Sequence, residues 1–280
     1  MAMVTGAEPT PFRCMEIRGG SRSVDEWLRT PGLDVWIHCR PFEGDDTGGD
    51  VHYVSRCGGG VITRLIVADV DGHGARVAAF SESLRALLRK NINTKSQTRL
   101  VESLNRQFGE ATDSLRFATA VVATYLANRR TLTVCNAGHP RPLWYRAVEK
   151  RWEPLVDSTE RPGNFPLGLV EQSPYGQFTV TLGKGDVVAF YTDALIEARD
   201  REGRLLMEEG LLNLARQIDM TDPSRVGPSL LSAVDRHRDG RPADDDVTLV
   251  TLFHDAGGPR RPSLREAIGV YAKLLRLRPV

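Results

Sequence analysis

The sequence predicts an α+β fold in which helices pack on antiparallel β-sheets. Three observations lead to this prediction. Apolar segments of strand length occur in groups, pairs of amphipathic helices separate the groups, and short turns join neighbouring strands. A parallel sheet would need a helical crossover between successive strands instead.

The composition is that of an ordinary folded protein, with 280 residues, 41% of them hydrophobic and 26% charged. A formal net charge of +1 gives no overall field that attracts nucleic acid or an anionic membrane, so neither is expected as a partner. Four scattered cysteines without a C-x-x-C pair favour a reducing compartment. Because there is neither a secretory signal nor an apolar run of the ~20 residues that span a bilayer, we expect a cytoplasmic protein.

The first part of the chain combines an irregular segment with strands and helices. Residues 1–30 are rich in Gly, Pro and Ser, which predicts a loosely ordered leader. Alternating apolar residues predict a strand at Leu33–Cys39, and an apolar run predicts a central strand at Val61–Val70. Apolar residues at helical spacing predict one helix through Phe80–Leu88 and a second through Leu100–Ala111.

A β-rich block follows, and turns such as Leu182–Asp186 separate its strands. The predicted strands are Phe117–Leu126, Thr131–Asn136, Leu143–Arg146, Phe178–Leu182 and Val187–Thr192. Two more helices come next, one through Leu211–Ile218 and one that begins at Asp222 as N-cap with Pro223 in the first helical position. A final strand is expected at Val247–Phe253.

The last segment, residues 257–280, predicts an appended basic amphipathic helix. Ser263 and Glu266 form a capping box at its start, and apolar residues line one face. Such a face packs most often on its own domain or on a second copy, so a homodimer or a partner contact through this helix is expected.

Acidic residues stand at the edges of apolar strands at four places: Asp50 in TGGDVHY, Asp69 in VADVDGHG, Asp193 in AFYTDALIE and Asp244–Asp246 in PADDDVTLV. A single Asp at such a place is most often a turn or cap residue. Four such places in one β-rich domain favour a metal centre, because buried carboxylates need cations to neutralise them. Oxygen ligands suit Mg²⁺ or Mn²⁺, and a pair of these ions can clamp a phosphate and activate a water molecule.

The motif D-x-D-G at Asp69 allows two other interpretations. A calcium loop would need a bidentate Glu where Phe80 stands, so it is excluded. A haloacid-dehalogenase-type phosphatase would use Asp69 as nucleophile and Asp71 as acid/base. That motif continues with Thr rather than His73, and its fold is parallel, so it remains a minor alternative.

Six stretches in order carry a family resemblance: GGDVHYV (48–54), IVADVDGHG (66–74), CNAGHPRPLWY (135–145), FPLGL (165–169), GDVVAFYTDALIEARD (185–200) and DDVTLV (245–250). The set resembles the PPM-type (type-2C-like) metal-dependent serine/threonine phosphatases, in their bacterial SpoIIE-like branch. The resemblance implies an αββα sandwich of two antiparallel sheets flanked by helix pairs, formed by residues 31–256. It also implies two Mn²⁺ or Mg²⁺ ions at one end of the sandwich.

Roles follow from the resemblance residue by residue. Asp69 matches the carboxylate that bridges both metals, and the Val70 carbonyl completes one coordination shell. Asp193 and Asp245 match the remaining carboxylates of the first metal. Asp50 matches the acid near the second metal, so Asp69 and Asp50 are the expected catalytic residues.

Several neighbours of these acids have no inherited role as ligands. Asp71 and Asp246 are expected to support the ligands, and Asp244 to be a solvated turn acid. Ala194 stands where the family usually has glycine. His73 and His139 are expected to shape turns, and His52 lies near the site without an inherited role.

The resemblance implies hydrolysis of phosphoserine or phosphothreonine on a protein by a metal-activated water. It further implies, as substrate, a phosphorylated anti-sigma-factor antagonist of the STAS type. The rival from another class is a catalytically silent phosphatase fold that binds a phosphoprotein or regulator, and Ala194 is the residue that keeps it open.

Overall fold

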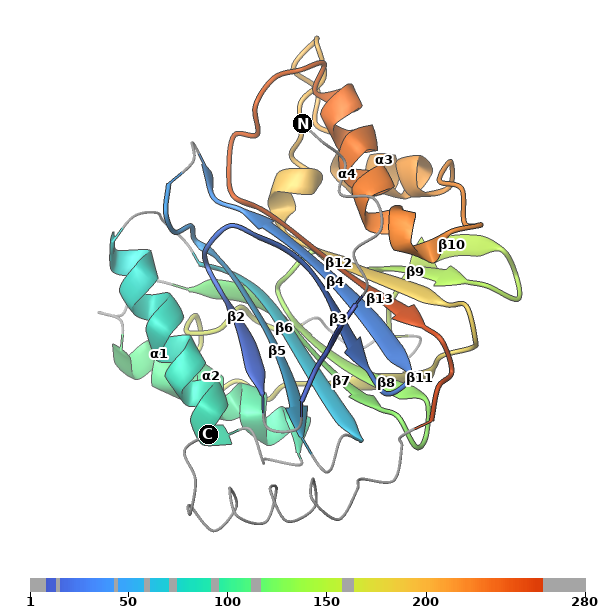
Figure 1. Ribbon diagram of the computed structural model, residues 1–280. Coiled ribbons are helices and arrows are strands. Elements are labelled where there is room, and N and C mark those ends of the chain that lie inside the picture. Colours follow the sequence, from blue (N-terminus) through green and yellow to red (C-terminus); the bar gives the residue numbers. More distant parts are fainter. Residues whose placement is uncertain are drawn as a thin grey trace.

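The computed structural model describes residues 9–13, 16–42, 45–57, 61–70, 75–91, 96–111, 117–157 and 164–258. Two β-sheets pack face to face, and a pair of helices covers the outer side of each sheet (Figure 1). The predicted αββα sandwich is therefore confirmed.

The first sheet has seven strands in the order β1-β3-β4-β13-β12-β9-β10. Their bounds are β1 Thr10–Pro11, β3 Val24–Thr30, β4 Leu33–Arg40, β13 Val247–His254, β12 Val187–Tyr191, β9 Leu143–Arg146 and β10 Arg151–Pro154. Neighbouring strands run antiparallel, except that β1 pairs with β3 in parallel. Short turns therefore suffice for most of the connections, as the sequence predicts.

The second sheet has six strands in the order β11-β8-β7-β6-β5-β2, and all its neighbours are antiparallel. Their bounds are β11 Phe178–Thr181, β8 Thr131–Ala137, β7 Ala118–Leu126, β6 Ile62–Val70, β5 Asp50–Cys57 and β2 Ile17–Gly20. Strand β6 lies between β5 and β7, and both of its faces are covered: Leu65 and Val67 lie in the inter-sheet core, and Ile66 and Ala68 lie under the helices, which explains why its sequence is apolar on both faces.

The helices lie on the two outer faces. Helices α1 (Ala75–Asn91) and α2 (Gln97–Ala111) cover the second sheet, and α3 (Met207–Ala215) and α4 (Val226–His237) cover the first (Figure 1). Two short 3₁₀ turns, η3 (Asp193–Leu195) and η4 (Pro223–Arg225), precede α3 and α4. Asp222 is an N-cap as predicted, but of η4, the 3₁₀ turn that leads into α4, because its carboxylate accepts a hydrogen bond from the Ser224 backbone N–H at 3.0 Å.

Three apolar layers hold the sandwich together. Val67 and Phe190 meet between the sheets, Ile66 and Leu104 meet between the second sheet and its helices, and Trp36 lies in the third layer, under α3 and α4. Each of these side chains is at most 2% exposed, so truncating one to alanine is expected to cost about 2–5 kcal/mol.

The prediction of a loosely ordered leader over residues 1–30 is wrong for residues 17–30. Strand β2 pairs with β5, and β3 pairs with β4 along its whole length from Val24 to Thr30. The alternation in VDEWLRT puts Leu28 fully inside the inter-sheet core, and the neighbouring glycines and serines hide this short strand in the sequence. The domain thus includes residues before position 31.

Two other features lie at the limits of what the structure describes. Residues 1–8 and 259–280 lie outside the described residues, so the predicted C-terminal helix stays a prediction. Of the helices that the structure describes, none has the length and apolar character to cross a membrane.

Candidate metal centre

Both sheets bring acidic residues to the same end of the sandwich. Asp50 is the first residue of β5, and it lies directly opposite Asp69, near the end of β6. In the other sheet, Asp193 follows the end of β12 and Asp245 precedes the start of β13. Because β12 and β13 are antiparallel neighbours, the end of one and the start of the other lie at the same edge.

A hydrogen bond joins these two groups across the sheets. The Thr192 hydroxyl donates to Asp50 Oδ2 at 2.7 Å, and the same hydroxyl oxygen accepts from the Thr248 backbone N–H at 3.0 Å. Asp50 is only 2% exposed. Burial raises the pKa of Asp50 well above its usual value, and the negative charge of Asp69 raises it further. Without a cation, the fold therefore favours a proton on this carboxyl group.

Asp246 fixes the segment that carries Asp50. Its carboxylate accepts hydrogen bonds from the backbone N–H groups of Phe42 at 2.6 Å, Gly49, and Asp50 at 3.3 Å. Gly48 packs against the same carboxylate, since a Cβ on Gly48 would lie 2.4 Å from Asp246 Cγ. Asp246 thus binds backbone of the opposite sheet and holds Asp50 in place.

Asp193 and Asp245 form a second electrostatic pair. Burial raises the pKa of Asp193 to about 6, and the charges of Glu197 and Asp245 add to the shift. Asp245 is exposed, and its Oδ1 accepts a hydrogen bond from the Asp246 backbone N–H at 2.7 Å. Negative charge is therefore gathered at the strand ends of both sheets.

Ala194 fits the turn in which the family usually has glycine. It lies in η3 with no positive φ, and its methyl group packs into the apolar layer under α3 and α4. Its carbonyl accepts a hydrogen bond from Arg238 Nη2 at 2.7 Å, and the Arg238 side chain is 5% exposed. Sequence reasoning missed Arg238, since nothing in HRDGRPADDD separates it from the solvated arginines beside it.

Two of the three histidines that the sequence places near the site, His52 and His139, lie within the described residues, and both are buried. His139 Nδ1 lies 2.9 Å from the Thr119 hydroxyl, and Thr119 is the cross-strand partner of Asp69. The Asn136 side chain bonds both the N–H and the carbonyl of His139, each at 2.8 Å, which fixes the turn as predicted. Burial lowers the pKa of His139 to about 3 and the pKa of His52 to about 4. The positions predicted for Asp71 and His73 lie outside the described residues.

The donor set suits a hard divalent cation. It consists of carboxylate oxygens at the strand ends and the Val70 carbonyl at the end of β6, the kind of ligands that Mg²⁺ and Mn²⁺ prefer. Burial, together with neighbouring acids, raises the pKa of Asp50 and of Asp193, and a bound cation would favour the ionised form of both groups. Within the part of the chain that the structure describes, no three His, Cys, Asp or Glu side chains lie close enough to enclose an ion. The acids there form two pairs, Asp50 with Asp69 and Asp193 with Asp245.

The dehalogenase-type alternative is wrong. Its nucleophile belongs on the first strand of a parallel sheet, whereas Asp69 lies on β6 between two antiparallel neighbours.

Two packed antiparallel sheets, flanked by helix pairs and carrying carboxylates at one end, define a PP2C-type phosphatase domain. The model of the family described as Stage II sporulation protein E (SpoIIE) matches residues 60–254, and the chain belongs to this family. The resemblance that the six motifs indicated is thereby confirmed.

Characterised relatives agree with this assignment. The chain is 26% identical to the phosphoserine phosphatase RsbU of Bacillus subtilis (strain 168) over 196 residues, which are 67% of this chain and 54% of RsbU. It is 24% identical to the phosphoserine phosphatase RsbP of the same organism over 138 residues, which are 48% of this chain and 33% of RsbP. The chain thus spans about half the length of RsbU and a third of RsbP.

Solved structures show the same fold. The RsbU and RsbW domains of Rv1364c from Mycobacterium tuberculosis superpose with a TM-score of 0.69 at 27% identity, covering 88% of this chain and 68% of that one. RsbX in complex with magnesium superposes with a TM-score of 0.59 at 17% identity, covering 82% of this chain and 98% of RsbX. At that identity the second likeness concerns the fold alone.

Proposed function

We propose that this chain hydrolyses phosphoserine or phosphothreonine on a protein, with two Mn²⁺ or Mg²⁺ ions at the strand ends. The observation that carries the proposal is that Asp50 and Asp69 of one sheet and Asp193 of the other lie at the same end of the sandwich, where Thr192, next to Asp193, bonds to Asp50. The names of RsbU and RsbP as phosphoserine phosphatases support the reaction, and the magnesium complex of RsbX supports the kind of ion.

Each acid has a distinct part in this proposal. Asp69, the Val70 carbonyl oxygen, Asp193 and Asp245 would hold the first ion, and Asp69 with Asp50, directly or through water, would hold the second. Bound ions of this kind lower the pKa of a water molecule and offset the charge on the phosphoryl oxygens. Because metal ligands must be deprotonated, binding releases the proton that burial favours on Asp50.

Bound cations would also stabilise the arrangement of the acids. The acids repel each other within each pair, Asp50 with Asp69 and Asp193 with Asp245, and divalent ions bound there would offset this repulsion. Thr192 and Asp246 keep the two pairs in reach of each other, because each bonds from one sheet to the segment that carries Asp50.

The proposed substrate is a cytoplasmic phosphoprotein, namely a phosphorylated anti-sigma-factor antagonist of the STAS type. Its support is the SpoIIE-family membership and the similarity to RsbU. A second candidate function is a silent fold that binds a phosphoprotein. It is favoured by one observation, that the acids among the described residues form pairs rather than a closed cage.

Phosphate release from p-nitrophenyl phosphate and from phosphoserine peptides tests the proposal. We expect turnover with Mn²⁺ or Mg²⁺, none in EDTA, and a loss of at least 100-fold, about 2.7 kcal/mol, in Asp69→Asn and Asp193→Asn. Asp244→Asn is the matched control, because Asp244 is an exposed acid in the same loop as Asp245. If high enzyme concentrations give no metal-dependent turnover while the peptides still bind, the silent fold is the correct function.

A further inference from the structure

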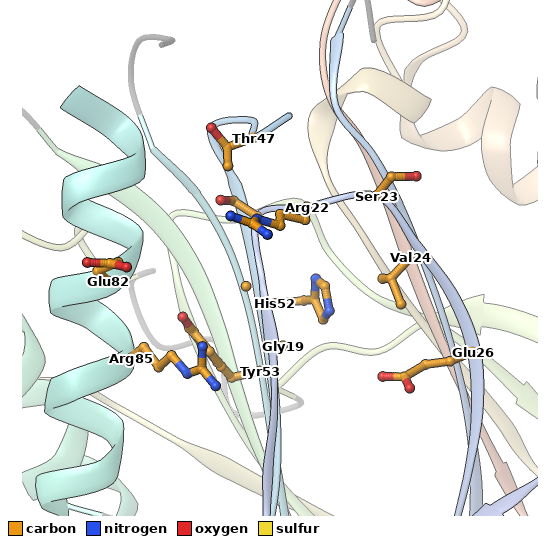
Figure 2. Close-up of a pocket in the computed structure, with 12 residues that line it drawn as sticks. Gly19, Arg22, Ser23, Val24, Glu26, Thr47, His52, Tyr53, Glu82 and Arg85 are labelled. Atoms are coloured by element: carbon orange, nitrogen blue, oxygen red, sulfur yellow. The ribbon is translucent and has the colours of Figure 1, made fainter. Parts of the chain in front are cut away.

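A cavity of about 650 Å³ lies next to the candidate metal centre, where the edge strand β2 meets α1 and the start of β3 (Figure 2). Its wall includes backbone of β2, the loop after β2, His52 of β5 and Arg85 of α1. The backbone N–H of Gly48 donates to the Ser21 carbonyl at 2.9 Å, so the loop after β2 is joined to the segment that carries Asp50. The cavity and the acids therefore share one end of the sandwich.

Two glycines keep this cavity open. Gly19 and Gly20 have φ values of +134° and +152°, which disfavour any other residue. A Cβ on Gly19 would lie 1.9 Å from the His52 carbonyl oxygen, so only glycine allows β2 to approach β5 here. A Cβ on Gly20 would meet nothing within 4 Å, which shows that this position faces open space.

His52 provides a buried polar group inside the cavity. Its side chain projects from β5 toward the part of the wall formed by Val24 (Figure 2). The residue is 2% exposed, and its ring Nδ1 has no hydrogen-bond partner among the described residues. A buried nitrogen without a hydrogen-bond partner is unfavourable, so a ligand or solvent atom that bonds to it is favoured.

The charged side chains in the wall of the cavity are two arginines and two glutamates. Arg22 reaches in from the loop after β2 and Arg85 from α1 (Figure 2), and neither guanidinium has an ion pair within the described part of the chain. Of the two acids in the wall, Glu26 already pairs with Arg18 at 3.2 Å, which leaves Glu82. Two unpaired guanidinium groups against one unpaired carboxylate favour an anionic ligand.

The geometry points to a subsite for an acidic residue of the substrate polypeptide, close to its phosphorylated residue; this inference rests on the proposed phosphatase function. Asp50 and His52 lie on one face of β5 and are two residues apart, which is about 7 Å along a strand. An extended peptide advances about 3.3–3.6 Å per residue. A peptide whose phosphoryl group lies at the acids thus places a carboxylate about two positions away in the cavity.

Two measurements on the full chain test the subsite. The first compares kcat/KM for phosphoserine peptides with Asp or Asn two positions before or after the phosphoserine. The second measures the affinity of the same fluorescein-labelled peptides in EDTA, where no turnover occurs. We expect about a fivefold to tenfold preference for the Asp peptide in both, and loss of the preference in the double variant Arg22→Ala/Arg85→Ala. Arg89→Ala is the matched control, an exposed arginine of α1 outside the cavity.

The outcomes separate the subsite from the reaction. Equal use and equal binding of the Asp and Asn peptides by the wild-type chain would overturn the inference, as would a preference that survives the double variant. Loss of turnover on every substrate with the binding preference intact would instead contradict the phosphatase function alone. Inorganic phosphate is also tested as a competitor in EDTA. If it displaces the Asp peptide and the Asn peptide from the wild-type chain equally well, the cavity binds free phosphate and the peptide subsite is overturned.

Discussion

Asp246→Asn tests whether this carboxylate holds the two sheets together at the metal end. Asp246 Oδ1 accepts from the Phe42 N–H, and Oδ2 accepts from the N–H groups of Gly49 and Asp50. An asparagine has one carbonyl oxygen, so its NH₂ group must face at least one of these three donors. The residue is 7% exposed, so water cannot readily replace the lost acceptor.

The expected loss of stability follows from these contacts. One buried donor without a partner costs about 1–3 kcal/mol, and the remaining bonds become neutral and weaker by about 1 kcal/mol each. Removing a negative charge close to Asp50 offsets a small part of this loss, because burial, Asp69 and, least of the three, Asp246 raise the pKa of Asp50. The net loss is about 2–4 kcal/mol, which for a chain of this size corresponds to about 4–16 °C in Tm.

Thermal unfolding followed by circular dichroism in EDTA measures this loss without a contribution from metal binding. Asp244→Asn is the control, because Asp244 is an exposed acid two residues away and should change the free energy of unfolding by less than about 0.5 kcal/mol. If Asp246→Asn unfolds at the same temperature as Asp244→Asn, the carboxylate does not hold the segment and the reasoning is refuted.

Three further changes test other parts of the site and fold. The folded-state pKa of Asp193, about 6, lies above its unfolded value of 3.8, so metal-free protein should lose stability as the pH rises from about 4 to 6. Asp193→Asn should therefore be more stable than wild type by about 1–2 kcal/mol at pH 7.5 in EDTA, a range discounted for the partial exposure of this carboxyl group, and no more stable at pH 3.5. Urea denaturation at both pH values measures the difference in the free energy of unfolding. Equal stability of the two proteins at pH 7.5 would contradict the raised pKa. Arg238→Ala removes the donor to the Ala194 carbonyl and should weaken Mn²⁺ binding about tenfold by calorimetry, whereas unchanged affinity would show that Arg238 does not position η3. Gly227→Ala places a Cβ 2.1 Å from the Trp36 ring and should lower the stability by about 1–3 kcal/mol, measured as Tm; an unchanged Tm would mean that α4 does not pack this closely.

Much of the candidate site could be predicted because its acids carry a local signal. Asp50, Asp69, Asp193 and Asp245 each stand where an apolar strand begins or ends, and this pattern is visible in one short window of sequence. The strands with long apolar runs, β6 among them, were predictable for the same reason.

The groups that link the acids could not be predicted, because their partners are distant in sequence. Thr192 bonds Asp50 across 142 positions, and Arg238 bonds Ala194 across 44. The sequence pattern also does not predict strand β5. Its inward-facing positions include His52 as well as Val54, and a buried histidine breaks the alternation of apolar residues. Contacts of this kind depend on how the two sheets pack, and a short sequence pattern does not predict that packing.

The division of the acids between two sheets has a thermodynamic consequence. Because each sheet supplies part of the candidate metal centre, an ion can bind well only when the sheets are packed in the correct relative position. Metal binding is then linked to the stability of the inter-sheet core rather than to one loop. At a free metal concentration 100 times Kd, this linkage adds about 2.7 kcal/mol to the folded state. The hydrogen bonds of Asp246 and Thr192 hold the segment that carries Asp50 in place before any ion binds. Less of the binding free energy would then be needed to order the site.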